Sequence, residues 1–248
     1  MVFQETVAIF SAAWWTSIAI ALTFIIVFLK LPSHFSFARK KIYSKFIGTI
    51  ILINLIIENG YGLYLGVWNI KHFLPLHFCG ISGILASILM FKYSNKMAIV
   101  LFYWGIIGGC YALMTPEFDL GTSGYFFYGY IISHASIILV SLYTILYQGF
   151  RPSRNSWMKT FFFTQLVAIC IGLVNWYLES NYMYLLSPPI AQNPMIFGKW
   201  PWYLFIFEIL AIIHFYMLYS SFHKIKSGIS ILQKTRIIQP FYNGTKSK

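Results

Sequence analysis

The sequence predicts an all-α membrane protein, a polytopic bundle of about seven transmembrane helices. Of its 248 residues, 58% are hydrophobic and only 10% are charged, against about 25% charged in an ordinary soluble domain. A soluble globule of this length cannot bury so much apolar surface. A soluble enzyme, a DNA-binding protein and a disulfide scaffold are therefore excluded.

Seven apolar stretches are each close to the roughly 20 residues that cross a bilayer core. They lie at about 9–29, 46–67, 75–91, 97–115, 126–147, 158–178 and 201–222. No basic residue precedes the first stretch, since the first lysine is Lys30, and its apolar run is too long for a cleaved signal peptide, so we expect a membrane span. An odd number of cysteines, three, all within these spans, argues against a disulfide framework.

The net charge of +12 is a topology signal. All basic residues except Lys71 and Lys199 fall in the first, third and fifth connections and in the tail. The positive-inside rule then places the N-terminus outside and the C-terminus in the cytoplasm. We expect one transmembrane domain over 1–222, a basic cytoplasmic tail over 223–248 that lies on anionic lipid, and no nucleic-acid partner.

We expect the functional site where polar side chains lie within the membrane. Burying such a side chain in lipid costs free energy, so those that occur there usually serve a site. With a rise of about 1.5 Å per residue, the main candidates all fall in the outer half of the bilayer. This depth predicts a cavity that opens outward. Its candidate residues are Asn54, Glu58, Asn59, His77, Cys79, His134, Asn175 and Glu208.

Cys79 gives the sharpest local signal. Pro75 suits the first turn of a helix, which puts Cys79 one turn in, where the positive helix end favours a thiolate. His77 points to another side of that helix, so His134 on a different span is the candidate base. The alternative is a packing role for Cys79 in a stripe of small residues over 79–86.

Other polar residues have simpler interpretations. Cys110 and Cys170 are expected to be packing residues. Each of Asn54, Asn59 and Asn175, taken alone, is expected to join two helices by a hydrogen bond. A carboxylate in lipid must be neutral, paired or solvated, which keeps Glu58 and Glu208 as candidates. His214 is six residues from Glu208 and is expected to face elsewhere.

Seven short motifs stand between about residues 58 and 222. They are LPLHFC at 74–79, YWG at 103–105, LMTP at 113–116, GLVNW at 172–176, NYMYL at 181–185, PP at 188–189 and WPWY at 200–203. Together they resemble the YwaF-like family of bacterial integral membrane proteins. That family is similar to a vertebrate multi-span acyltransferase that remodels ether phosphatidylethanolamine. More distantly it resembles the androgen-induced hydrolases of fatty-acid esters.

The resemblance implies a cysteine nucleophile at the position of Cys79 and a histidine partner at that of His134. It also implies a multi-pass protein of the cell membrane, in bacteria the plasma membrane, whose partner is a phospholipid or other fatty-acyl lipid. The vertebrate substrate specificity is not carried over, and no cofactor is expected.

The leading hypothesis is a lipid acyltransferase or lipid-ester hydrolase that works through a thioester on Cys79. Asn175 or Asn59 would donate to the oxyanion, and Glu58 or Glu208 would orient His134. The long loop over 179–199 is expected to act as a lid, with Asn181, Tyr182 and Tyr184 as its candidate residues.

Three alternatives remain. A small-molecule transporter or substrate-binding membrane subunit would use the same cavity, although the sequence has no inverted repeat of the kind that marks transporters. A retinal photoreceptor needs a lysine in the seventh span, which has none. A metal enzyme is disfavoured because no ligand pair has helical i, i+3 or i, i+4 spacing, so no metal is expected. The acyl donor, acceptor, chain length and oligomeric state stay open.

Overall fold

The computed structural model describes residues 5–118, 121–122, 124–191 and 196–234 and is almost entirely helical. Its elements, in chain order, are β1 (Glu5–Thr6), α1 (Ala12–Lys30), η1 (Leu31–His34), α2 (Phe37–Tyr64), α3 (Ile70–Phe73), α4 (Phe78–Phe91), α5 (Asn95–Met114), β2 (Glu117–Phe118), α6 (Tyr125–Tyr147), α7 (Ser156–Leu178), η2 (Tyr182–Tyr184) and α8 (Trp202–Lys234). The predicted all-α membrane bundle is confirmed.

Six helices, α1, α2, α5, α6, α7 and α8, are long and apolar enough to cross a membrane. The third predicted span, 75–91, is wrong in length, because α4 has only 14 residues and is about 21 Å long, against a bilayer core of about 30 Å. Leu74 is extended (φ −66°, ψ 141°), as expected of a residue before proline. Pro75 therefore lies in a turn before the helix and not in its first turn.

Two other predicted boundaries also move. α2 begins at Phe37, so much of the basic connection expected before residue 46 is helical. α8 runs without a break past residue 222 to Lys234, so the first part of the predicted tail continues the seventh span. The rest of the tail, 235–248, lies outside the described residues.

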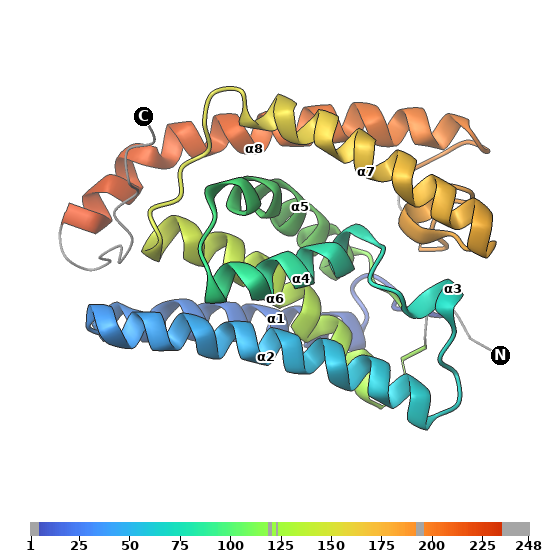
Figure 1. Cartoon of the computed structure of the whole chain (residues 1–248), viewed down its shortest axis with the longest axis horizontal. Coiled ribbons are helices and arrows are strands. Elements are labelled where there is room, and N and C mark those ends of the chain that lie inside the picture. Colours follow the sequence, from blue (N-terminus) through green and yellow to red (C-terminus); the bar gives the residue numbers. More distant parts are fainter. Residues whose placement is uncertain (1–4, 119–120, 123, 192–195, 235–248) are drawn as a thin grey trace.

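α6 is the centre of the bundle, surrounded by α1, α2, α4 and α5 (Figure 1). Its inward face is completely packed, with Ala135, Leu139 and Val140 fully buried. α5 lies close to it at Gly109, where an added Cβ would come within 2.6 Å of Ile138 Cγ1 and 3.0 Å of the His134 carbonyl oxygen. Small residues let membrane helices approach in this way.

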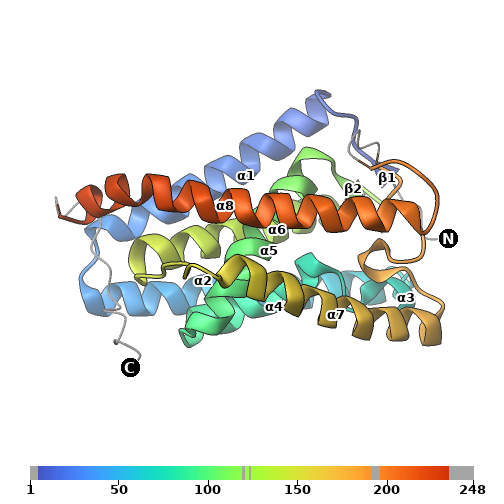
Figure 2. The same ribbon diagram turned by 90° about the horizontal axis from the view of Figure 1, so that it is seen from above.

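α7 and α8 run side by side as a separate layer over α4 and α5, as Figures 1 and 2 show from two directions. Large apolar side chains of both helices are exposed, among them Phe162, Leu173 and Trp176 on α7 and Ile209 on α8. A soluble monomer rarely exposes so large an apolar surface. We take this surface as lipid-facing.

The N-terminal segment is tied to the connection between α5 and α6. β1 pairs antiparallel with β2, with Glu5 opposite Phe118. The Glu5 carboxylate accepts a hydrogen bond from the Thr122 backbone N–H at 2.8 Å and another from the Thr122 hydroxyl. β1 and the C-terminal part of α8 lie at opposite ends of the bundle (Figures 1 and 2).

Candidate functional site

A cavity of about 500 Å³ is lined by residues of the α7–α8 layer and of helices α2, α4, α5 and α6. Aromatic and aliphatic side chains make most of its wall, yet three carboxyl groups and four histidines also line it. These are Glu58, Glu117, Glu208, His72, His77, His134 and His214. Among the described residues, neither a lysine nor an arginine lines it. The cavity of this strongly basic protein therefore carries no lysine or arginine charge from those residues.

Cys79 enters the cavity from the first turn of α4. The helix begins at Phe78 with His77 as its N-cap, which places the half-buried Cys79 second in the helix. The turn before it is fixed by a close approach, because a Cβ on Gly80 would lie 2.8 Å from the Pro75 Cα. The first N–H groups of a helix have no acceptor within that helix, so the backbone beside the thiol offers hydrogen-bond donors.

His134 enters the same cavity from α6. Its Nδ1 lies 2.7 Å from the Tyr130 carbonyl oxygen one turn earlier. A carbonyl oxygen can only accept, so Nδ1 carries the proton and Nε2 of the neutral ring keeps a lone pair. The Tyr130 ring packs on the imidazole with centroids 4.1 Å apart. The ring of His134 is thus held in one orientation with a basic nitrogen left over.

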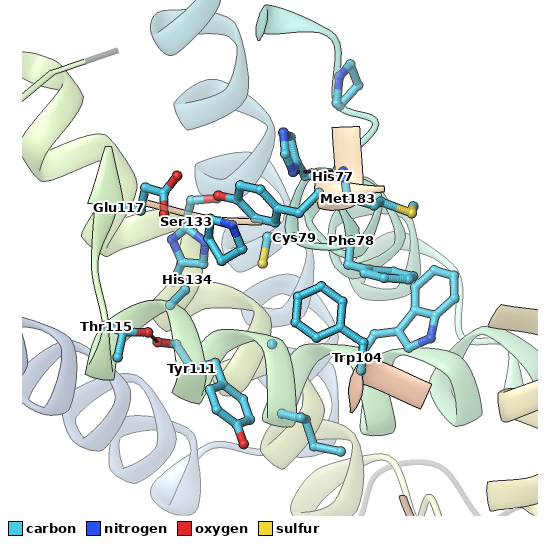
Figure 3. A pocket seen from close by; sticks show the side chains of 18 of the residues that line it. His77, Phe78, Cys79, Trp104, Tyr111, Thr115, Glu117, Ser133, His134 and Met183 are labelled. Atoms are coloured by element: carbon cyan, nitrogen blue, oxygen red, sulfur yellow. Dashed lines mark hydrogen bonds between the residues drawn. The ribbon is translucent and has the colours of Figure 1, made fainter. Parts of the chain in front are cut away.

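Adjacent glycines of α5 lie against the two helices that carry these residues. A Cβ on Gly108 would lie 3.6 Å from the Cys79 Sγ, and one on Gly109 would lie 3.0 Å from the His134 carbonyl oxygen. α4 and α6 therefore pack on neighbouring positions of one helix. In Figure 3 the sulfur and the imidazole lie in the same part of the cavity.

The predicted role of a carboxylate in orienting His134 is wrong, because the Tyr130 carbonyl occupies Nδ1. Glu58 and Glu208 do line the cavity. Glu208 of α8 instead accepts a hydrogen bond from the Gln165 amide of α7 at 2.6 Å. This pair joins the two helices of the covering layer.

Asn175 does not line the cavity, so its predicted role as an oxyanion donor is also wrong. It is fully buried, and its amide nitrogen donates to the Tyr182 carbonyl oxygen at 2.8 Å. Its amide oxygen accepts from the Ser180 hydroxyl at 2.9 Å and from the Tyr182 N–H at 2.8 Å. Asn175 is the anchor of the loop that follows α7.

This loop covers one side of the cavity, and its three predicted residues have different positions. Tyr184 lines the cavity. Tyr182 is fully buried, and its hydroxyl donates to the Ile70 carbonyl oxygen at 2.5 Å. Asn181 closes the loop on itself, donating to the Ser187 carbonyl oxygen at 3.0 Å.

His77 joins the same loop to α4. Its Nδ1 accepts a hydrogen bond from the Met183 backbone N–H at 3.2 Å. Its ring centroid lies 5.3 Å from those of Tyr182 and Tyr184. The loop is therefore fastened to the start of the helix that carries Cys79.

The two asparagines of α2 also differ. Asn54 does not line the cavity, contrary to the prediction. It is buried and joins α2 to α6, donating to the Gly129 carbonyl oxygen at 3.2 Å and accepting from the Tyr125 hydroxyl at 2.6 Å. Asn59 lines the cavity, and its amide oxygen accepts from the Trp68 indole at 3.1 Å.

Sequence reasoning missed several polar residues of the cavity. His214, which was expected to face elsewhere, lines it, and its Nε2 lies 3.0 Å from the Tyr111 hydroxyl. Glu117 is buried and accepts from the Ala191 N–H at 2.9 Å. The signal for His214 was present, because Phe207, Ala211 and His214 lie along one helical face.

Cys110 and Cys170 are exposed and not the packing residues that were expected. Among the described residues, no three His, Cys, Asp or Glu side chains gather closely enough to hold a metal ion. Of the three cysteines, Cys79 lines the cavity together with its polar residues.

These features define a multi-pass membrane protein with a polar cavity among its helices. Residues 9–219 match the model of the TMEM164 family, and the chain belongs to that family. No functionally curated protein and no solved structure matches it. This match does not test the resemblance to the YwaF-like family or to the acyltransferase. Both resemblances still rest on the sequence motifs.

Proposed function

We propose that the protein is a membrane-embedded lipid acyltransferase or lipid-ester hydrolase in which Cys79 is the nucleophile and His134 the base. The observation that carries the proposal is that both side chains line one cavity, with Nδ1 of His134 committed to the Tyr130 carbonyl and Nε2 left to take a proton. A nucleophile beside an oriented base is the arrangement that covalent acyl transfer requires.

In the first half-reaction, His134 Nε2 takes the proton of the Cys79 thiol. The thiolate attacks the ester carbonyl carbon of a fatty-acyl lipid, and the tetrahedral intermediate collapses to a thioester. The leaving alkoxide takes the proton back from His134. In the second, His134 takes a proton from an alcohol or from water, whose oxygen attacks the thioester. The Cys79 sulfur leaves and is protonated by His134.

The developing oxyanion needs donors that are already in place. With Asn175 committed to the loop, the best-placed groups are the backbone N–H groups at the start of α4, beside the thiol itself. The apolar wall of the cavity supports the proposal further, since it suits an acyl chain and excludes water.

The test uses the purified full chain in lipid nanodiscs, given phosphatidylcholine as donor and a lysophospholipid as acceptor. Wild-type protein should form a hydroxylamine-sensitive adduct of fatty-acyl mass on the Cys79 peptide. Cys79→Ala should lower turnover by about three orders of magnitude or more. His134→Ala should lower it by about two to four orders. The double variant should lose little more than either single variant.

The matched controls are Cys110→Ala and Cys170→Ala, which remove exposed thiols and should keep wild-type turnover. Wild-type turnover by Cys79→Ala would show the covalent mechanism to be wrong. The cavity would then be better explained as a transport or binding site, and uptake or binding of a small molecule would replace acyl transfer as the assay.

A further inference from the structure

The surroundings of Cys79 differ in chemistry on its two sides. In Figure 3, Glu117, Ser133 and His134 lie on one side of the thiol, and the rings of Phe78 and Trp104 lie on the other. An acyl chain gains free energy for each methylene that it moves from a polar to an apolar environment. A chain attached to Cys79 therefore runs toward the aromatic side.

Trp104 lies on that side of the cavity. On α5 it is one turn before Gly108, the residue that faces the Cys79 Sγ, so the two positions are about 6 Å apart along the helix. Trp104 lines the cavity and is only 4% exposed. Tyr103 and Phe215, whose ring centroids are 5.1 Å apart, are also buried and line the same cavity.

The indole of Trp104 is held in place from three directions. Its Nε1 donates to the Thr164 hydroxyl of α7 at 2.8 Å. The Phe78 ring meets it edge-on with centroids 5.0 Å apart, and the Phe163 ring stacks on it at 5.8 Å. A ring held in this way forms a fixed wall and cannot swing aside for a longer ligand.

We propose that Trp104 closes the acyl-chain end of the cavity and sets the longest fatty-acyl chain that Cys79 can carry. The proposal rests on the proposed function, since it concerns the chain of the Cys79 thioester. It assigns chain-length selection to one residue of α5 that takes no part in the chemical steps.

The experiment gives the full-length protein in nanodiscs an equimolar mixture of hexanoyl, octanoyl, decanoyl and lauroyl phosphatidylcholine, because a wall about 6 Å along α5 from the thiol meets a chain within its first several carbons. Mass spectrometry of the Cys79 peptide then measures how much of each thioester forms. Trp104→Ala should raise the ratio of the longest to the shortest chain by about tenfold or more, because one methylene in an apolar pocket changes discrimination by about 10- to 200-fold. Trp104→Phe should shift the ratio less and in the same direction.

Thr164→Val removes the hydrogen bond to the indole but keeps the ring, and should give a small shift toward longer chains. The matched control is Trp176→Ala on α7, whose indole is 80% exposed and should leave the ratio unchanged. An unchanged ratio in Trp104→Phe and Trp104→Ala, with normal total thioester, would overturn the role of Trp104 alone. Absence of any thioester on wild-type Cys79 would instead overturn the proposed function, and this inference with it.

Discussion

The Nδ1 of His134 and the carbonyl oxygen of Tyr130 are 2.7 Å apart, within one turn of the central helix. The same relationship is repeated on α8, where the Nδ1 of His214 lies 2.6 Å from the Leu210 carbonyl oxygen. In both residues a backbone carbonyl fixes the tautomer. The two histidines differ at Nε2. In His214 this nitrogen lies 3.0 Å from the Tyr111 hydroxyl, whereas in His134 it keeps a lone pair that can take a proton.

The first prediction concerns this tautomer. In protein with ¹⁵N-labelled histidine, the His134 resonances should show a protonated Nδ1 and an unprotonated Nε2, because a carbonyl cannot donate to Nδ1. The measurement is solid-state NMR in lipid, with His134→Gln to assign the signals. A signal with the proton on Nε2 would contradict the proposed role of His134 as the base.

The second prediction separates two adjacent glycines. A Cβ on Gly109 would lie 2.6 Å from Ile138 Cγ1, so Gly109→Ala should destabilise the α5–α6 contact by about 1–3 kcal/mol, as overpacking does. A Cβ on Gly108 would meet the Cys79 Sγ at an ordinary 3.6 Å, so Gly108→Ala should keep its stability and lower turnover by crowding the thiol. Thermal unfolding and thioester yield measure the two effects. Equal loss of stability in both variants would contradict this description of the α5 surface.

The third prediction tests Asn175 as a structural residue. Asn175→Ala leaves the buried Ser180 hydroxyl and the Tyr182 backbone without their partner, and each buried group left unsatisfied costs about 1–3 kcal/mol. The variant should therefore unfold at a lower temperature, while the exposed Asn155→Ala should not. At a temperature where it remains folded, its thioester should form at nearly the wild-type rate. A rate lowered a hundredfold there would restore Asn175 as an oxyanion donor.

Much of the fold follows from apolar run length alone, and six of the seven predicted spans correspond to long helices. The failure at α4 has a local cause, because Pro75 was placed in the helix and lies in a turn packed on Gly80. Run length cannot distinguish a helical residue from an apolar residue of a buried turn.

Within the candidate site, depth counting grouped Cys79, His134, Glu58 and Glu208, and all four line one cavity. It could not tell which polar groups are already committed to the backbone, as Asn175 is. His214 was left out of the predicted site for another reason. Six residues rotate a helix by about 600°, so Glu208 and His214 point about 120° apart, yet the cavity is wide enough to contact both.

The fourth prediction concerns pH and the N-terminal segment. The hydrogen bonds from Thr122 hold the pKa of the Glu5 carboxyl below its ordinary value of 4.5. A lowered pKa means that the contact contributes fully above that value and is lost as the pH falls through the lower, folded pKa. Protease protection of the β1 segment should thus be complete at neutral pH and decrease in acid. Glu5→Gln should lose it at neutral pH, whereas equal protection of that variant and wild type would contradict the role of the carboxylate.

The last prediction concerns orientation in the membrane. The end of the bundle that carries Lys199 and the loop after α7 is nearly free of basic residues, whereas the opposite end carries Arg154 and Lys159. The positive-inside rule predicts that the first end faces away from the cytoplasm. In a background without cysteines, Lys199→Cys and Asn155→Cys both give exposed positions, and an impermeant maleimide should label only the former in intact cells. After lysis both should react, which controls for accessibility. Labelling of Asn155→Cys but not of Lys199→Cys in intact cells would invert the protein and place the loop after α7 on the cytoplasmic side.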